Sequence, residues 1–510
     1  MSRTALSIRN SVISLLAQVV TLIMQFVVQI VFVRSLTANY LGANGLFTNL
    51  VSFLSFAELG IGASITFALY KPLVDEDWTQ LDALLSFFKK IYRAIGLFII
   101  VIGVALTPFL GFFVRKGSSI PDIQFMFLIY VLGTAVSYFY SYSRSIFIAA
   151  QFSYINTLNQ VGFRVLQNVG QIIALFYFQS YLGYLVLIIA GNFLSNLMIT
   201  RMAESRFPNL TWRSKSLVSP EVLETLKKNV IGNVSAKIGA IVVFGTDNIL
   251  ISKYLGLGVV GLYSNYTLIT QGIISVLSQV MNAVLASFGN LGATASVEKQ
   301  EKVYYDSLYF VSLLTFVSTI TMYAVIQPFV QTWFSSEYVL PGSTVFLIAL
   351  NLGFNNLRKA NLNYMSALGL FWPQRYKSLV EAAVNFIVSF ALIRMTKLGI
   401  NAVLLGTIFS NLTINFWWET LVVFKYGFNK SMKKALLKLG IQHVVLAFGL
   451  LIVKGILQVF EIRGMLSILV SSLVFAMGSL IFYVVLFIKT PETEYFKTVA
   501  FGLVRKVLKR

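Results

Sequence analysis

The sequence predicts an all-α polytopic membrane protein of about fourteen transmembrane helices, arranged as two parallel-repeat six-helix bundles plus two C-terminal helices. Two observations predict this class. The 510 residues are 57% hydrophobic and 12% charged, with a mean hydropathy of +0.79, which is far from the composition of a soluble domain. The second observation is that the chain repeats itself.

Apolar runs long enough to cross a bilayer recur along the chain, since about 20 apolar residues suffice for one helical crossing. The predicted spans are roughly 11–33, 40–68, 86–114, 123–147, 155–178, 182–202, 229–253, 259–289, 304–332, 342–368, 376–396, 399–424, 436–459 and 464–488. The first twelve form two sets of six, and the last two have no counterpart in the repeat.

The repeat is seen in sequence landmarks that recur at a nearly constant spacing. They are Asn10 and Asn229 (219 residues apart), Gly42 and Gly261 (219), Pro108 and Pro328 (220), Gly183 and Gly399 (216), and the segments 191–197 and 406–412 (215). A unit with an even number of spans enters the membrane in the same direction in both copies. The copies should therefore be related by a pseudo-two-fold axis along the membrane normal, as in transporters built from parallel repeats.

This repeat sets the expected domain limits. We expect an N-terminal six-helix bundle at 1–202, a cytoplasmic linker at 203–225, a C-terminal six-helix bundle at 226–424, two extra transmembrane helices at 425–488 and a basic cytoplasmic tail at 489–510.

The net charge of +21 reflects topology rather than a nucleic-acid partner. If the N-terminus is cytoplasmic, most of the 40 lysines and arginines fall in inward segments. The outward loops carry only Arg34, Arg115, Lys116, Lys253, Arg394, Lys397 and Arg463. This positive-inside bias places both termini in the cytoplasm. The basic segments 201–228 and 425–438 are expected to contact anionic membrane lipids, and no nucleic acid is expected to bind.

Composition also excludes several kinds of chemistry. The chain has no cysteine and one histidine, His443, which excludes thiol chemistry, structural zinc and haem. It lacks the Gly-x-x-x-x-Gly-Lys-Ser/Thr phosphate loop, so we expect no ATP hydrolysis. The predicted outward loops are too short to shelter a catalytic site. We therefore expect neither an enzyme nor a metal or other cofactor.

Polar side chains form stripes along several predicted spans, and such stripes should face another helix or a water-filled cavity. The stripes are Ser14, Gln18, Thr21, Gln25 and Gln29 in span one; Asn156, Gln160, Arg164, Gln167 and Gln171 in span five; Asn233, Lys237 and Asn248 in span seven; and Asn351, Asn355 and Arg358 in span ten. Lys377 and Glu381 lie 217 residues after Gln160 and Arg164, at the corresponding positions of the second copy. Hydrogen bonds between helices, worth about 1 kcal/mol each, explain any single amide.

Stripes centred on cations favour a water-filled, net cationic cavity between the two halves, because an arginine or lysine at mid-membrane costs roughly 2.5–3.5 kcal/mol. The candidate substrate-binding residues are Arg164, Lys237, Arg34, Lys253, Arg358, Gln18, Gln25, Gln167 and Asn248. Three acidic residues are candidates either for ion coupling or for salt bridges: Glu58, Asp247 and Glu381. A cationic cavity suits an anionic substrate.

The spans, the duplicated unit and the segment 34–42 (Arg-Ser-Leu-Thr-Ala-Asn-Tyr-Leu-Gly) resemble the bacterial polysaccharide biosynthesis flippases. These belong to the multidrug/oligosaccharidyl-lipid/polysaccharide (MOP) exporter superfamily. Segment 253–264 (Lys-Tyr-Leu-Gly-Leu-Gly-Val-Val-Gly-Leu-Tyr-Ser) matches the same pattern, and the resemblance covers about 1–424. It implies two bundles forming a V and an alternating-access cycle. In the lipid II flippases of this superfamily, two extra C-terminal helices line a groove for the lipid tail, and spans thirteen and fourteen are expected to do likewise.

The resemblance implies a flippase of the bacterial cytoplasmic membrane that exports an undecaprenyl-diphosphate-linked oligosaccharide for capsule or another surface polysaccharide. A polysaccharide polymerase and glycosyltransferases are expected as further partners. Arg164 is expected to bind the diphosphate or its adjacent sugar, or else to form a salt bridge with Glu381. The alternatives are a cation-coupled multidrug exporter of the same fold and a lipid II flippase. A membrane polymerase or ligase is disfavoured by the short outer loops.

Overall fold

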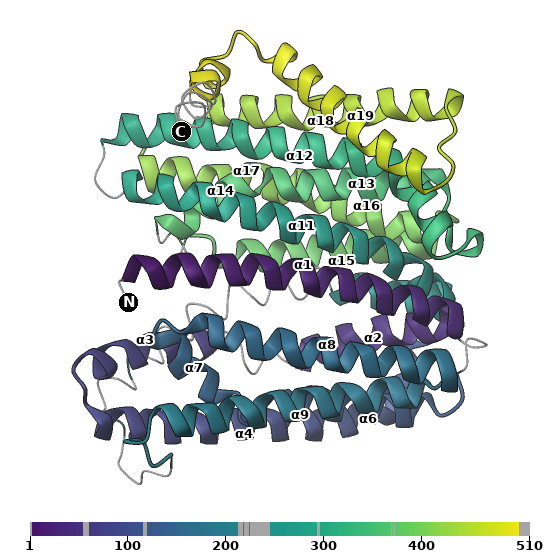
Figure 1. The fold of residues 1–510 in the computed structure, drawn as a ribbon. Helices are drawn as coiled ribbons and strands as arrows, with labels where there is room; N and C mark the ends of the chain where they lie inside the picture. Colours follow the sequence, from purple (N-terminus) through teal and green to yellow (C-terminus); the bar gives the residue numbers. More distant parts are fainter. Residues whose placement is uncertain are drawn as a thin grey trace. The chain divides into compact units, whose positions relative to one another are not determined.

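The computed structural model describes residues 3–54, 61–115, 120–212, 245–292, 296–368 and 373–498, together with 218, 224 and 370. The regular elements of this part are all helices (Figure 1). The chain divides into two compact units, Met1–Ser264 and Asn265–Arg510. The predicted all-α membrane fold is therefore confirmed.

The first unit contains nine labelled helices and the start of a tenth. They are α1 (Arg3–Ser35), α2 (Ala38–Leu54), α3 (Ile61–Val74), α4 (Trp78–Leu106), α5 (Leu110–Phe113), α6 (Ile123–Tyr138), α7 (Tyr142–Ala149), α8 (Ser153–Phe178), α9 (Tyr181–Arg206) and α11 (Leu257–Gly292), which continues into the second unit.

Local sequence signals explain where several of these helices begin and end. The carboxylate of Asp77 accepts a hydrogen bond from the backbone N–H of Gln80 at 2.9 Å and so caps α4. The hydroxyl of Ser180 caps α9 in the same way, through the N–H of Gly183 at 3.0 Å. Pro108 cannot donate a backbone hydrogen bond, and α4 gives way to a short 3₁₀ turn at Thr107–Phe109.

Within the first unit, α1 packs along α8, α8 along α9, and α6 against both α9 and α4. The core between these helices holds fully buried aromatic side chains, including Phe47, Phe88 and Phe127. The beginning of α11 crosses α2 closely at two glycines, Gly42 and Gly261.

The second unit contains α12 (Val297–Trp333), α13 (Gly342–Leu357), α14 (Lys359–Ala367), α15 (Lys377–Met395), α16 (Ile400–Ser410), α17 (Phe416–Leu421), α18 (Lys433–Val459) and α19 (Met465–Leu486). Two π-helical segments, η4 (Asn411–Asn415) and η5 (Val422–Phe428), flank α17. The packed pairs α12–α13, α13–α16 and α15–α16 recur in the order of α4–α6, α6–α9 and α8–α9. The two C-terminal helices, α18 and α19, both pack on α12.

Within the described residues, 9 helical segments are long and apolar enough to cross a membrane. The number rises to 10 when α6 and α7, which are bent by 41° relative to each other, count as one span. Two other predicted spans, 40–68 and 229–253, include residues outside the described part, and 342–368 is divided between α13 and α14. Part of the linker 203–225 also lies outside it, so the domain limits stay predictions.

Candidate functional site

A partly buried hydrogen-bond network in the first unit is centred on Arg144. This residue lies on α7, two residues into the helix that comes after the bend at the end of α6. Its Nε and Nη2 donate to Oδ1 of Asn196 at 3.0 and 2.9 Å, and Nη2 also donates to the hydroxyl of Ser195 at 2.8 Å. Its Nη1 donates to Oδ1 of Asn156 at 2.5 Å. One guanidinium therefore joins α7 to α8 and α9.

Arg144 borders a polar hollow of about 420 Å³ inside the first unit. The lining consists of hydroxyl groups, two amides, the guanidinium and one aliphatic side chain: Thr66, Tyr92, Ser137, Tyr138, Ser141, Ser145, Asn156, Gln160, Arg144 and Ile148. This volume lies within the range of about 300–1,000 Å³ that is common for ligand sites.

The charge of Arg144 is not compensated within the described part of the chain. Its hydrogen bonds there go to side-chain oxygens of Asn156, Ser195 and Asn196, and the described residues that line the hollow include no carboxylate. Ser195 and Asn196 are 7% and 4% exposed. A cation held by neutral oxygens in an apolar bundle keeps a strong attraction for an anion.

The second unit contains a closely related arginine, Arg358. It directly follows α13, which is the counterpart of α6, and its Nη1 donates to Oδ1 of Asn411 at 2.9 Å. Asn411 belongs to the segment Ser-Asn-Leu at 410–412, and Asn196 belongs to Ser-Asn-Leu at 195–197. Both repeats therefore join an arginine, located shortly after the first helix of the fourth span, to the asparagine of the same motif.

The surroundings of the two arginines differ in charge. Arg358 contacts the carboxylate of Glu381 at 3.1 Å and that of Glu419 at 2.5 Å. Lys377 contacts the same two carboxylates at 2.9 and 2.6 Å. These four side chains form a buried, charge-balanced cluster, which we call the ion quartet, and Asn415 donates a further hydrogen bond to Glu381 at 2.6 Å.

A local change of helix type explains why, among the described residues, a glutamate contacts the arginine of the second unit and none contacts Arg144. Glu419 follows Asn411 by eight residues, and Glu204 follows Asn196 by the same number. In α9 the helix is α-helical throughout, and Glu204 is exposed. In the second unit η4 is π-helical, which adds one residue and rotates the remainder of the helix by about 100°. Glu419 is thereby rotated into the core, where it is 0% exposed.

The predicted polar stripes of spans one and five lie on two helices that pack against each other, α1 and α8. Gln25, Gln160 and Arg164 are exposed, and Gln18 is half-buried. Gln167 is 7% exposed. The cation of Arg164 is near enough to act electrostatically on the hydroxyls of Tyr130 and Tyr184, two half-buried residues.

Four further predicted site residues lie in the described part of the first unit. Arg34 is exposed in the last turn of α1, where a cation is favoured by the helix dipole. Lys253 lies 4.1 Å from the centre of the Phe112 ring. Asp247 is 9% exposed, and its neighbour Asn248 is half-buried. Lys237 and Glu58 lie outside the described residues.

Arg358 and Glu381 lie together in the ion quartet. Their charges are balanced by each other, by Lys377 and by Glu419, so Glu381 occupies a salt bridge within its own unit. The salt-bridge partners of Glu381 in this structure are Arg358 and Lys377.

The sequence prediction did not include Arg144, Lys377 or Glu419 among the site residues. Two signals pointed to them: the repeated Ser-Asn-Leu motif carries a polar side chain into each bundle, and a basic residue precedes it in the fourth span of each repeat. The motif served only as a marker of the repeat.

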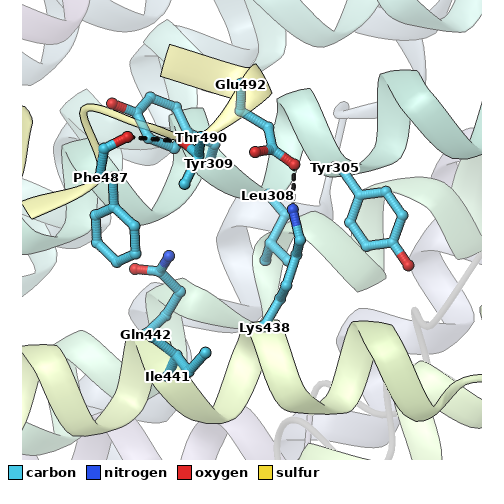
Figure 2. A pocket seen from close by; sticks show the side chains of 9 residues that line it. All are labelled: Tyr305, Leu308, Tyr309, Lys438, Ile441, Gln442, Phe487, Thr490 and Glu492. Carbon is cyan, nitrogen blue, oxygen red and sulfur yellow. Dashed lines mark hydrogen bonds and ion pairs between the residues drawn. The ribbon is translucent and has the colours of Figure 1, made fainter.

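A smaller hollow of about 140 Å³ lies between α12, α18 and the segment after α19 (Figure 2). Lys438 and Glu492 form an ion pair beside it, and the Tyr305 ring lies 4.8 Å from the Lys438 amine. The remaining lining is Leu308, Tyr309, Ile441, Gln442, Phe487 and Thr490. The hollow is small for a ligand site, and the lipid-tail groove on spans thirteen and fourteen stays a prediction.

The fold is similar to that of several solved membrane transporters. An inward-facing multidrug resistance MATE family transporter superposes with a TM-score of 0.63 at 15% identity, covering 84% of this chain and 99% of that chain. The lipid II flippase MurJ, in an inward closed conformation, superposes with a TM-score of 0.60 at 14% identity, covering 94% and 99%. A MOP superfamily transporter from Pyrococcus furiosus gives 0.55 at 15% identity, covering 83% and 96%.

These solved structures are transporters and a flippase, and the likeness in fold covers most of each chain. No protein-family model matches the sequence. No curated protein matches it either.

Proposed function

We propose that this protein is a MOP-superfamily flippase that moves a polyprenyl-diphosphate-linked oligosaccharide repeat unit across the bacterial cytoplasmic membrane. The observation that carries the proposal is the exposed cation of Arg164 in the middle of α8. Arg164 lies eleven residues after Ser153, which is about 16 Å along the helix at 1.5 Å per residue. That distance reaches roughly the middle of a hydrocarbon layer about 30 Å thick.

A cation exposed at this depth is costly in lipid, so the face that carries it is expected to border water. Gln25 and Gln160 are also exposed, and they extend the same polar character over α1 and α8. Such a face suits cargo with negative charge and many hydrogen-bonding oxygens. A diphosphate joined to sugars has both, and charge-assisted hydrogen bonds to it are stronger than neutral ones.

In this proposal Arg164 binds the diphosphate or the adjacent sugar. Lys237, Arg34 and Lys253 contribute to the electrostatic field, whereas the charge of Arg358, also a candidate, is balanced within the ion quartet. The cargo's polyprenyl tail stays in the lipid, and no bond is made or broken. Both termini are cytoplasmic, and the cargo is supplied by glycosyltransferases and consumed by a polysaccharide polymerase.

The same fold also serves multidrug export, and a cation-coupled exporter requires carboxylates available to a cationic drug or ion. In the described part of the second unit, Glu381 and Glu419 each contact Arg358 and Lys377, so their charges are already balanced. This balance favours anionic cargo. A lipid II flippase shares the diphosphate chemistry and differs in the sugar and peptide that are carried.

Deletion of the gene, followed by analysis of lipid-linked intermediates, tests the proposal. We expect the surface polysaccharide to disappear and undecaprenyl-diphosphate-linked repeat units to accumulate in the inner leaflet. A mutant that keeps its polysaccharide and becomes sensitive to cationic dyes would instead identify a multidrug exporter. Accumulation of lipid II would identify a cell-wall flippase.

A further inference from the structure

We propose that the hollow beside Arg144 is a binding site for a diphosphate group. The chemistry of the site fits a free inorganic diphosphate as well as a lipid-linked one. The choice of the lipid-linked diphosphate rests on the proposed function. It concerns residues inside the first unit. Two of them, Asn156 and Gln160, belong to the span-five stripe, but Arg164 itself does not line the hollow.

The second unit indicates what an arginine that bonds the repeated asparagine can hold with its other donors. Arg358 donates from Nη1 to the repeated asparagine, Asn411, and its guanidinium also contacts the carboxylates of Glu381 and Glu419. Its Nε donates to Oε2 of Glu419 at 3.2 Å and its Nη2 donates to Oε1 at 2.5 Å. A forked, bidentate contact of this kind is the geometry in which a guanidinium binds carboxylate or phosphate oxygens.

In the first unit Arg144 donates to the equivalent asparagine, Asn196, and no described carboxylate contacts it. Glu204, the residue with the spacing of Glu419, is exposed because α9 lacks the π-helical turn. Asn156 supplies an amide oxygen to Nη1. The hollow of about 420 Å³ thus borders an arginine whose counterpart in the second unit is occupied by anionic oxygens.

The donors around this hollow are held in place before any ligand arrives. A guanidinium has five N–H groups, and the contacts of Arg144 with the described residues use four of them, which leaves one Nη1 N–H for a ligand. The hydroxyl of Ser195 is itself fixed by donation to Asn159 at 2.9 Å. Hydroxyls of Ser137, Ser141 and Ser145 line the same space. The hydroxyls of Ser137 and Ser141 donate to the backbone carbonyls of Thr134 and Tyr138 in this structure. A diphosphate can accept at once from the remaining Nη1 N–H, and from these two hydroxyls after they rotate away from the carbonyls.

The volume and position agree with this ligand. The hollow is larger than a single phosphate requires and leaves room for the first sugar. Under the predicted topology, α7 lies at the cytoplasmic end of span four, which is the side from which a lipid-linked precursor arrives. We therefore assign the hollow to the diphosphate and the sugar next to it.

Binding to the full-length protein in phosphatidylcholine nanodiscs provides the test. The probe is radiolabelled inorganic diphosphate, measured by equilibrium dialysis at low salt, with undecaprenyl diphosphate in the nanodisc as competitor. The variants are Arg144→Gln, which removes the cation, and Asn156→Asp, which gives Arg144 a protein carboxylate as the second unit does for Arg358. Lys454→Gln, which removes an exposed cation from α18, is the control.

We expect saturable binding to the wild-type protein and to Lys454→Gln, and weakening of at least about tenfold in both hollow variants, as the loss of charge-assisted hydrogen bonds predicts. Competition by undecaprenyl diphosphate that is lost in the same variants supports the lipid-linked source. Diphosphate binding without such competition assigns the hollow to the free anion and overturns the lipid-linked source.

The site is overturned if the wild-type protein shows no saturable binding, or if folded Asn156→Asp binds within twofold of it. Asn156→Asp adds a favourable pair and so keeps the test open if Arg144→Gln fails to fold. The proposed cargo and the proposed diphosphate site are contradicted by different results. A deletion strain that accumulates lipid-linked repeat units but is fully complemented by Arg144→Gln contradicts the site alone. Arg144-dependent binding in a strain whose polysaccharide is unaffected contradicts the cargo alone.

Discussion

Gly42 and Gly261 face each other's backbone at one crossing of α2 and α11, within the first unit. A Cβ atom on residue 42 would lie 1.8 Å from the carbonyl oxygen of Leu257, and one on residue 261 would lie 2.1 Å from the carbonyl oxygen of Ala38. Residues 38 and 257 are separated by the same 219 positions as the two glycines. The contact is therefore reciprocal, as at a local two-fold axis, and neither copy of the segment tolerates a side chain there.

A glycine-to-alanine substitution should have opposite effects at this crossing and on the open face of α8. Gly42→Ala must push the helices apart, and we expect it to destabilise the protein by about 1–3 kcal/mol, as overpacking does elsewhere. Gly162→Ala, on α8, meets nothing within 4 Å and should stabilise slightly through helix propensity. Thermal unfolding in detergent, measured by tryptophan fluorescence, compares the two. Equal unfolding midpoints for the two variants would show that the close approach is absent in solution.

The ion quartet predicts a non-additive stability effect. Glu419→Gln leaves Arg358 and Lys377 sharing one carboxylate in a dry environment, and breaking a buried pair in this way costs about 3–5 kcal/mol. Adding Lys377→Met restores the balance, because Arg358 and Glu381 remain as a pair. We expect the double variant to unfold at a higher temperature than Glu419→Gln alone. If the losses of unfolding free energy caused by Glu419→Gln and by Lys377→Met simply added in the double variant, the four charges would not be coupled.

The transport role of Arg164 predicts that Arg164→Ala lowers complementation of a deletion strain at least about tenfold at normal protein level, because charge-assisted contacts to the cargo are lost. Lys454→Ala removes another exposed cation from a span and should leave transport unchanged. The readout is surface polysaccharide per cell. Full complementation by Arg164→Ala would exclude the proposed diphosphate contact.

Arg164→Glu combined with Glu381→Arg separates this role from a structural one. Glu381 already contacts Arg358 and Lys377, so we expect the exchange to remain inactive. Transport restored by the exchange would instead indicate a functional Arg164–Glu381 pair.

The predicted topology is testable because the chain has no cysteine. Ser431→Cys lies in the exposed connection before α18, and Arg463→Cys lies in the exposed connection between α18 and α19. We expect a membrane-impermeant maleimide to label Arg463→Cys in intact spheroplasts and Ser431→Cys only after lysis. The reverse pattern would place both termini outside.

Several features of this protein are determined by the sequence alone. Hydropathy located the helices, because a span of given length must be apolar in hydrocarbon. The glycines at 42 and 261 and the Ser-Asn-Leu motifs at 195–197 and 410–412 revealed the duplication, which is then seen in the recurring order of packed helix pairs. Helical periodicity also placed Gln160 and Arg164 on one face, and both are exposed in the structure.

Only the tertiary structure decided which polar side chains meet. Arg144 reaches Asn196 because α7 is bent by 41° relative to α6. Glu419 reaches Arg358 because the π-helical segment η4 rotates it toward the core. Periodicity assumes a straight helix with 3.6 residues per turn, so it cannot anticipate a bend or an added residue. The sequence thus determined the fold and the duplication. The helix irregularities of each copy determined that one arginine is balanced by carboxylates and the other is left facing a polar hollow.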